Sequence, residues 1–164
     1  MIRPLRVEDA EELTSLYRAN RGFLAPFEPV RPESFFTTEW QRMRIEQHVA
    51  NGLHAFAILD AGAIAGLVNL FGIVPEGVES AAIGYWVDAA RNGRGLATGA
   101  VGEILRYAFG ELGLHRVEAA TLVDNVRSQR VLEKNGFERI GVARRFLRIG
   151  GDWRDHVLFQ HLSD

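Results

Sequence analysis

One segment near the middle of the chain restricts the fold more than any other. The apolar run AAIGYWVD leads into the loop NGRGLAT, residues 92–98, which is followed by the helical pattern GAVGEILRYAF and the strand pattern HRVEAATLV. A strand, a loop, a helix and a second strand in this order form a parallel crossover, with the helix on one face of the sheet. The loop therefore lies where the first strand of a parallel pair ends.

Further strands and helices surround this crossover. Alternating or continuous apolar runs predict strands, whereas apolar residues three and four positions apart predict helices. We expect strands at residues 2–6, 54–60, 63–74, 79–88, 115–123, 137–149 and 153–162, and helices directly after Asp9 and at about 38–51, 96–110 and 126–135. Three successive strands before the crossover and two after its last helix indicate an α+β fold with a mixed sheet.

Local signals mark some element ends. Asp9 and Glu12 have the spacing of a capping box, which predicts that they cap the first helix. The segment FLAPFEPVRPESF, residues 23–35, is expected to be a loop, because its three prolines interrupt regular backbone pairing. Gly52 is expected to stop the second helix in the left-handed conformation.

Length and composition narrow the class of protein. A chain of 164 residues fits a single domain, residues 1–164, and a net charge of −2 gives no basic bias for binding nucleic acid. The absence of cysteine excludes disulfides, thiolate metal sites and cysteine nucleophiles. No His, Asp and Glu residues have metal-ligand spacing, so no metal is predicted. No apolar stretch is long enough for a membrane span and no signal peptide is recognisable, so we expect a cytoplasmic protein.

The loop 92–98 has the features of an anion site. Glycine adopts positive φ without strain and lets the backbone approach a ligand closely. A helix N-terminus adds unpaired N–H groups and the positive end of the helix dipole. We expect the amides of Gly93 to Thr98 to point at one phosphate, with Arg91 or Arg94 adding charge. The spacing matches neither the Walker motif nor GxGxxG, and a simple glycine-rich corner remains an open alternative.

The whole segment IGYWVDAARNGRGLATGAV resembles the acetyl-CoA loop of the GNAT N-acetyltransferase superfamily. That loop follows the pattern Gln/Arg-x-x-Gly-x-Gly/Ala, and here Asn92, Gly95 and Ala97 occupy the three positions, so Asn92 departs from the pattern. LHRVEAATLVDNVRSQRVLEKNGFERIG is similar to the second cofactor segment of the family, including N-x-x-S and L-E-K-x-G-F. FLAPFEPVRPESF and GGDWRDHVL are similar to the ribosomal-protein-alanine N-acetyltransferase branch (the RimJ/RimL type), nearer to RimJ. The resemblance implies a mixed seven-stranded sheet with splayed middle strands, flanked by about four helices.

The resemblance also implies roles for individual residues. The pantetheine arm of acetyl-CoA is expected along the strand before the loop, and its pyrophosphate on the loop amides. The cofactor-binding residues that it implies are Trp86, Val87, Asn92, Gly93, Arg94, Gly95, Leu96, Ala97, Thr98, Asn125 and Ser128. Ser128 is expected to protonate the departing thiolate or to hold its sulfur. Helix capping is the alternative explanation for Asn125 and Ser128.

The sequence offers one candidate for the general base, Glu79. Many GNAT enzymes carry a glutamate where this chain has Ala82. Glu79 is the carboxylate nearest to that position and is therefore the candidate base. The alternative is that Glu79 is only a solvated charge at the end of the strand. Freeing an α-amine at pH 7 costs roughly 1.4 kcal/mol, whereas freeing a lysine amine costs roughly 4.6 kcal/mol. A weak base therefore suffices for a protein N-terminus. We expect direct attack of the amine on the thioester in a ternary complex.

The sequence allows more than one acceptor substrate. Phe27, Arg31, Trp40 and Tyr85 are the candidate acceptor-binding residues, although aromatic residues beside prolines also serve as core plugs. His156 in WRDH is a candidate for the wall of the acceptor pocket, and a role in strand pairing explains it equally well. The expected acceptor is a protein N-terminal Ala or Ser. A small amine, such as a polyamine or aminoglycoside, and a non-catalytic acyl-CoA-binding module are the alternatives. A homodimer is compatible with the family.

Overall fold

The computed structural model describes residues 1–163. Seven strands and four α-helices follow one another in the order that the sequence predicts, with three short 3-10 helices between them. The elements are β1 Ile2–Pro4, η1 Val7–Asp9, α1 Ala10–Leu24, η2 Glu33–Phe36, α2 Thr38–Ala50, β2 His54–Asp60, β3 Ala63–Val74, β4 Ser80–Val87, η3 Ala89–Arg91, α3 Leu96–Gly110, β5 Arg116–Leu122, α4 Val126–Lys134, β6 Glu138–Ile149 and β7 Asp152–Leu162. The α+β class and the predicted seven-stranded sheet are confirmed.

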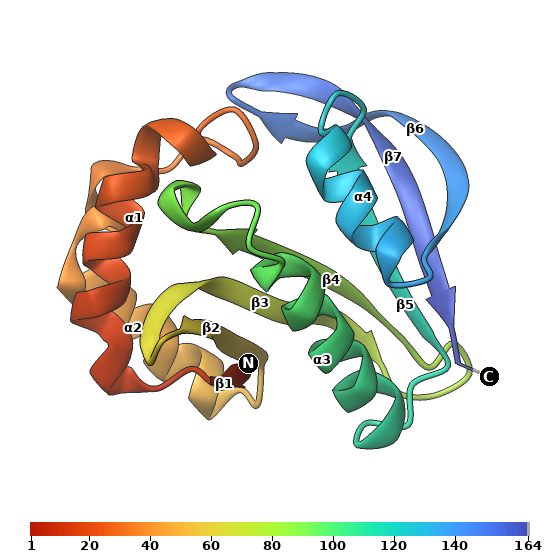
Figure 1. Ribbon diagram of the computed structural model, residues 1–164, viewed down its shortest axis with the longest axis horizontal. Helices are drawn as coiled ribbons and strands as arrows, with labels where there is room; N and C mark the ends of the chain where they lie inside the picture. Colours follow the sequence, from red (N-terminus) through yellow and green to blue (C-terminus); the bar gives the residue numbers. More distant parts are fainter. Residues whose placement is uncertain (164) are drawn as a thin grey trace.

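The strands form one mixed sheet in the order β1-β2-β3-β4-β5-β7-β6. Every neighbouring pair is antiparallel except β4 and β5, which are parallel and are joined by α3. Such a connection has to cross over one face of the sheet, and α3 does so in Figure 1. The loop that precedes α3 therefore lies at the carboxyl end of β4.

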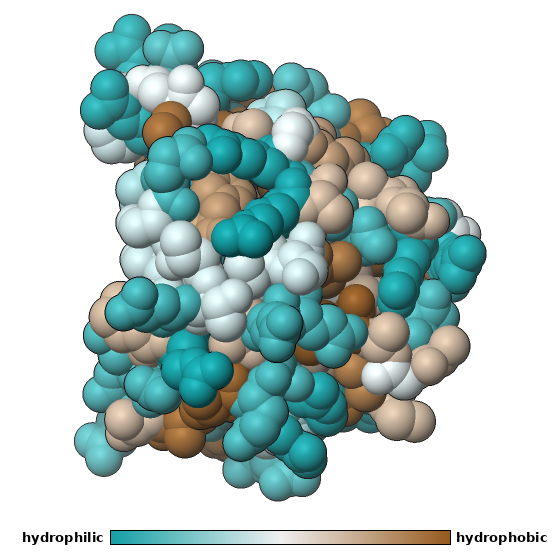
Figure 2. Space-filling model, turned by 90° about the vertical axis from the view of Figure 1, so that its left-hand side faces the viewer, coloured by the Kyte–Doolittle hydropathy of each residue, from teal (hydrophilic) through white to brown (hydrophobic). Residues whose placement is uncertain are grey.

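Helices cover both faces of the first half of the sheet (Figure 1). Successive residues of a strand point to opposite faces, so Phe56 and Ile58 of β2 pack in the core beneath α3, whereas Ala57 packs in a second core beneath α1 and α2. The outer surface of this α1–α2 layer is mainly hydrophilic, with separate hydrophobic spots (Figure 2). Within residues 1–163, no helix has the length and apolar content needed to cross a membrane.

The two parallel strands separate over most of their length. β4 and β5 pair only through Ser80, Ala81 and Ala82, which face residues 116–118, although β4 continues to Val87 and β5 to Leu122. β5 then pairs along its whole length with β7. The predicted splay of the middle strands is confirmed, and it opens toward the carboxyl end of β4, where the loop 92–98 lies.

Two local predictions were wrong. Asp9 makes no side-chain cap to α1; its carboxylate instead accepts two hydrogen bonds of 2.7 Å from Arg3 and one of 2.8 Å from the Arg6 amide. Glu12 accepts from the Ile64 amide at 2.6 Å, so it ties α1 to β3 rather than closing a capping box. The segment 23–35 is also shorter as a loop, because α1 runs to Leu24 and η2 begins at Glu33. Gly52 has φ of 61°, as predicted for the stop of α2.

Candidate active site

The loop before α3 presents backbone amides rather than side chains. Gly93 and Gly95 have φ of 81° and 79°, and Gly95 is the N-cap of α3. No side chain caps this helix end within the described residues, so the first amides of α3 have no partner from a capping residue. Such amides, together with the positive end of the helix dipole, form an anion site.

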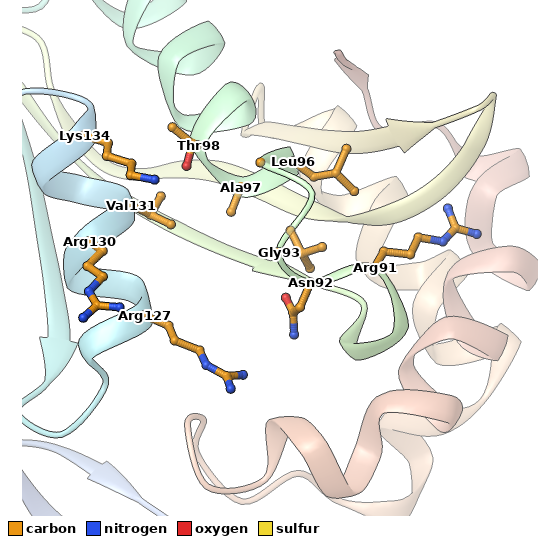
Figure 3. A pocket seen from close by; sticks show the side chains of 12 residues that line it. Arg91, Asn92, Gly93, Leu96, Ala97, Thr98, Arg127, Arg130, Val131 and Lys134 are labelled. Carbon is orange, nitrogen blue, oxygen red and sulfur yellow. The ribbon is translucent and has the colours of Figure 1, made fainter.

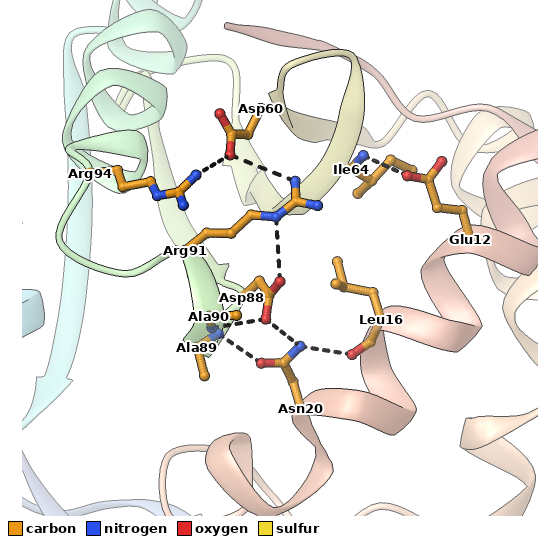
Figure 4. A network of polar contacts seen from close by, with 10 residues as sticks. All are labelled: Glu12, Leu16, Asn20, Asp60, Ile64, Asp88, Ala89, Ala90, Arg91 and Arg94. Atoms are coloured by element: carbon orange, nitrogen blue, oxygen red, sulfur yellow. Dashed lines mark hydrogen bonds and ion pairs between the residues drawn. The ribbon is translucent and has the colours of Figure 1, made fainter.

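A buried asparagine of α1 holds the loop in place (Figure 4). Asn20, which is only 1% exposed, accepts from the Ala89 amide at 2.8 Å and donates to Asp88 at 3.1 Å. Asp88 in turn accepts from the Ala90 amide at 3.2 Å. Because these bonds fix the backbone at the start of the loop, the amides that follow are oriented before any ligand binds.

The guanidinium groups of Arg91, just before the loop, and Arg94, within it, are turned toward carboxylates. Arg94 lies 3.0 Å from Asp60 in the β2–β3 turn, and Arg91 lies 3.5 Å from Asp88 and 3.9 Å from Asp60 (Figure 4). Their charges are therefore engaged by carboxylates, which is a correction to the expectation that they face the phosphate. For Arg94, only the backbone amide keeps the predicted role of facing a phosphate.

Positive charge reaches the loop from α4 instead. The loop, the first turn of α3 and one face of α4 enclose a cavity of about 490 Å³, here called the loop pocket. Arg127, Arg130 and Lys134 share that face because they are three and seven positions apart on the helix. Figure 3 shows Arg127 and Lys134 extending toward the loop with Arg130 between them. The sequence interpretation missed all three residues.

The width of the loop pocket is set by the end of α4. Asn135 donates to the Thr98 carbonyl oxygen at 3.2 Å and to the Val131 carbonyl oxygen at 2.9 Å, so it ties α4 to the first turn of α3. Gly136 follows with φ of 78°, and Phe137 is buried in the core. The run LEKNGF thus ends the helix and anchors it against α3.

A narrow slot leads from the loop pocket toward the sheet. It has a volume of about 160 Å³ and runs between the end of β4 and α4, with Trp86, Val87, Ala97, Asn125 and Ser128 in its walls. Asn125 caps α4 by accepting from the Ser128 amide at 3.2 Å, so the capping explanation holds for its side chain. All the predicted cofactor-binding residues except Arg94 therefore line the loop pocket or the slot.

Tyr85 and Ser128 form a hydrogen-bonded pair at the inner end of the slot. The Tyr85 hydroxyl lies 2.7 Å from Ser128 Oγ and 3.1 Å from the Ser128 carbonyl oxygen. Burial raises the pKa of Tyr85 to about 12, although its hydrogen bond with Ser128 lowers the pKa in part. Tyr85 is therefore protonated throughout the physiological range and is available as a hydrogen-bond donor to Ser128.

Two larger chambers open beyond this pair, and both are lined by Phe27 and Tyr85. The strand chamber, about 570 Å³, lies over the separated strands and is bounded by β5, β6 and β7, with Glu118 and His156 in its wall. The helix chamber, about 540 Å³, lies against α1 and α2, with Arg31, Trp40, Arg44 and His48 in its wall. The predicted acceptor residues Phe27, Arg31, Trp40 and Tyr85 are thus brought together around the helix chamber.

The candidate bases lie in different places. Glu79 is exposed at the start of β4 and lines none of these cavities within the described residues. Glu118 faces Ala82 across the β4–β5 pair and lines the strand chamber, but its carboxylate is half exposed and lies 3.4 Å from Arg116. His156 is buried in the chamber wall, and its Nδ1 lies 3.1 Å from the Arg154 carbonyl oxygen. A carbonyl only accepts, so Nδ1 carries the proton and Nε2 is left as the acceptor of the neutral ring.

Comparison with known proteins agrees with this geometry. The acetyltransferase (GNAT) domain model matches residues 1–138. The chain is 42% identical to the probable N-acetyltransferase YjcK of Bacillus subtilis (strain 168), over 99% of this chain and 93% of that protein. It is 34% identical to the ribosomal protein uS5-alanine N-acetyltransferase of Escherichia coli (strain K12), over 96% of this chain and 84% of that protein.

The fold agrees equally closely with a solved structure. Mycobacterium smegmatis RimJ in complex with CoA-disulfide superposes with a TM-score of 0.95 at 30% identity, covering 99% of this chain and 81% of that chain. The splayed parallel pair, the glycine loop before α3 and the sequence matches lead to one assignment. The chain belongs to the GNAT family of N-acetyltransferases, and within it to the RimJ branch.

Proposed function

We propose that this protein transfers the acetyl group of acetyl-CoA to the α-amine of a protein N-terminus that begins with Ala or Ser. One observation carries the proposal: the loop pocket shares lining residues with the slot, and the slot and both chambers meet at Tyr85, the partner of Ser128. Such a path accommodates a long donor from one side and an amine from the other. The likeness to the E. coli uS5-alanine enzyme supports the choice of acceptor.

The donor end fits a nucleotide with several phosphates. The amides of Gly93 to Thr98 would receive the pyrophosphate, and the cations of Arg127, Arg130 and Lys134 would face its charge. The slot walls of Trp86, Val87 and Asn125 would hold the pantetheine arm. Acetyl-CoA supplies the thioester whose acetyl carbon is transferred.

At the inner end of the slot, Ser128 would donate its hydroxyl proton to the sulfur that leaves when the C–S bond breaks. Tyr85 would donate a hydrogen bond to Ser128 Oγ and keep its proton. This bond fixes the serine hydroxyl with its hydrogen directed at the sulfur. In the other arrangement, Tyr85 donates its hydrogen bond to the Ser128 carbonyl oxygen, and the Ser128 hydroxyl donates to the Tyr85 oxygen. The serine proton is then not directed at the sulfur. The first arrangement is the one that serves proton donation.

The proton of the attacking amine needs an acceptor in the strand chamber. His156, whose Nδ1 faces the Arg154 carbonyl oxygen, would take this proton on Nε2 directly or through water. Glu118 is the weaker candidate because solvent and Arg116 already stabilise its charge. Glu79 lies outside the chambers and is given no part in proton transfer.

A mass-shift assay with two peptide sets tests the proposal. One set has a free N-terminal Ala, Ser or Met and no lysine, and the other has a blocked N-terminus and one internal lysine. We expect an acetyl mass shift only on peptides with a free N-terminal Ala or Ser. Acetylation of the internal lysine alone, or of neither set while acetyl-CoA still binds, would refute the assignment.

The proposal extends to the setting of the protein. An enzyme that acetylates ribosomal-type N-termini would act in the cytoplasm, and residues 1–164 would act as one domain. A homodimer remains a prediction; sedimentation of the purified protein tests it directly. The acetyl-CoA-dependent reaction needs no metal in this scheme, and unchanged turnover in a chelator would support that part.

A further inference from the structure

The helix chamber carries a basic stripe on α2. Trp40, Arg44 and His48 lie four positions apart on this helix and line the chamber together. Gln41 and Ile45 lie on the buried side of the same helix. The stripe therefore faces the space that leads to Tyr85, and its middle residue is a permanent cation.

Aromatic rings, rather than carboxylates, hold the Arg44 guanidinium. Its central carbon lies 5.7 Å from the Tyr17 ring, 5.7 Å from the Phe35 ring and 5.8 Å from the Trp40 ring. Among residues 1–163, no carboxylate lies within ion-pair distance of Arg44, and its enclosed Nε has no hydrogen-bond partner. A buried donor without a protein partner is uncommon, and an acceptor group of a ligand could satisfy it.

The other charges of the chamber do not balance Arg44. Glu28 lies 3.4 Å from Arg31, so this pair is neutral in sum. Burial lowers the pKa of His48, and the charge of Arg44 lowers the pKa further, so His48 is uncharged at neutral pH. The enclosed His48 Nδ1 also has no partner among the described residues. Arg44 thus leaves the chamber with one uncompensated positive charge beside unpaired polar atoms.

A cationic acceptor fits this chamber poorly. Aromatic faces attract cations, but Arg44 already lies against Tyr17, Phe35 and Trp40, and Arg31 lies 4.7 Å from the centre of the Phe35 ring. An additional positive charge, such as the distal amine of a polyamine, would meet Arg44 across a partly enclosed space. A carboxylate, by contrast, matches the planar fork of a guanidinium.

We infer that the helix chamber selects acceptors with a carboxylate close to the reacting amine, namely protein N-termini with an acidic side chain among their first few residues. The inference rests on the proposed function, since the amine of such an acceptor would lie beside Tyr85 and Ser128 while its carboxylate reaches Arg44. Each residue of an extended peptide spans about 3.3–3.6 Å, so the distance from the reacting amine to Arg44 decides which peptide position carries the favoured carboxylate.

The test uses the intact protein and a set of amidated seven-residue peptides. Each begins with a free Ala, contains no lysine, and has Glu at position 2, 3 or 4, with the matching Gln peptide as its partner. For at least one position, we expect kcat/KM for the Glu peptide to exceed that for the Gln peptide about 5- to 30-fold. Arg44→Gln is expected to reduce this ratio to below about 2-fold, by lowering only the rate on the Glu peptide.

Several controls separate charge recognition from damage to the fold. Arg42→Gln removes a charge from the exposed side of the same helix and should leave the Glu preference unchanged. Arg44→Lys keeps the charge without the planar fork and should keep part of the preference. If Arg44→Gln melts at a much lower temperature, Arg44→Lys carries the test. The KM for acetyl-CoA should stay the same in all variants.

The outcomes are distinct for the two proposals. Equal rates on Glu and Gln peptides at every position in the wild-type protein, or a Glu preference that persists in Arg44→Gln, would overturn the inference and leave N-terminal acetylation intact. Acetylation of no peptide at all would overturn both.

Discussion

The two ends of the active-site path are built in different ways. The proposed donor end is the loop pocket, which is lined by one continuous segment, residues 92–98, and by three cations from one face of α4. The proposed acceptor end is the helix chamber, which is lined by residues of α1, α2, β2, β3, β4 and the loop after α1. The loop pocket therefore depends mainly on the backbone of one short segment, whereas the helix chamber depends on side chains from several distant segments.

The difference has consequences for mutation. At the donor end, most substitutions leave the amides in place, so the sensitive residues are those that anchor the backbone. At the acceptor end, each wall residue changes the shape or charge of the chamber directly. Variants at the donor end should affect acetyl-CoA, and variants at the acceptor end should affect the choice of amine.

Ser128 lies where the two ends meet, and its removal should have the largest effect. We expect Ser128→Ala to lower turnover about 100-fold, because general acid–base groups contribute at least this much when they protonate a leaving group. The dissociation constant of acetyl-CoA, measured by calorimetry, should change less than about 2-fold because the slot is otherwise intact. Ser15→Ala on the exposed side of α1 is the control. Unchanged turnover in Ser128→Ala would remove the serine from the mechanism.

Asn20 should show that the donor end depends on its anchors. Asn20→Ala leaves the Ala89 amide and Asp88 without their buried partner, which costs about 1–3 kcal/mol. We expect a lower melting temperature and about 5- to 100-fold weaker acetyl-CoA binding, with the preference among acceptor peptides unchanged. Asn51→Ala, an exposed asparagine at the end of α2, should show neither effect. Full acetyl-CoA affinity in Asn20→Ala would mean that the loop does not need this anchor.

The cations of α4 should contribute a smaller, salt-dependent share. Replacing Arg127, Arg130 and Lys134 together by Gln should weaken acetyl-CoA binding about 10-fold, because exposed charge pairs contribute up to about 1 kcal/mol each. The wild-type affinity should fall with added salt more steeply than that of the triple variant. Gln at Arg42, Arg139 and Arg144, three exposed arginines elsewhere, is the matched control. Equal affinities for the two triple variants would exclude α4 from phosphate binding.

Tyr85 should give the smallest change at neutral pH. Tyr85→Phe removes one hydrogen bond to Ser128 and should lower turnover about 5-fold without changing acetyl-CoA affinity. Because the pKa of Tyr85 is raised to about 12 in the folded protein, its contribution to stability is complete below pH 10 and is lost as the pH rises toward 12. The unfolding free energy of Tyr85→Phe should therefore fall less than that of the wild type over this range. Parallel pH curves for the two proteins would contradict the burial of the Tyr85 hydroxyl, which is the cause of its raised pKa.

The sequence predicted the backbone of the loop 92–98, but not the cations of α4, because only the signals of the loop are local. Glycines that need positive φ, such as Gly93 and Gly95, and a strand followed by a helix can be recognised in one segment. The order of strands and helices also follows from local apolar periodicity, and the resemblance supplied the splay of β4 and β5. The helix predicted at about 96–110 corresponds to α3, Leu96–Gly110, for the same reason.

The sequence did not predict contacts between segments far apart in the chain. Asp9 and Glu12 satisfy the pattern of a capping box, but Arg3 and the Ile64 amide bind their carboxylates in the folded protein. The approach of Asp60 to Arg91 and Arg94 depends on the β2–β3 hairpin. Glu118 enters the strand chamber only through strand pairing, so no spacing along the chain could identify it. His156, which the sequence left between the acceptor pocket and strand pairing, does both, because it pairs with Leu122 and lines the strand chamber.

The contrast between a backbone-built donor end and a side-chain-built acceptor end is tested most directly by amide hydrogen exchange. We expect saturating acetyl-CoA to slow exchange in residues 88–100 and 123–135 and to leave residues 26–50 unchanged. Adding an Ala-initiated peptide to the complex with CoA should then slow exchange in residues 26–50. Protection of residues 26–50 by acetyl-CoA alone, without protection of residues 88–100, would contradict the assignment of the two ends.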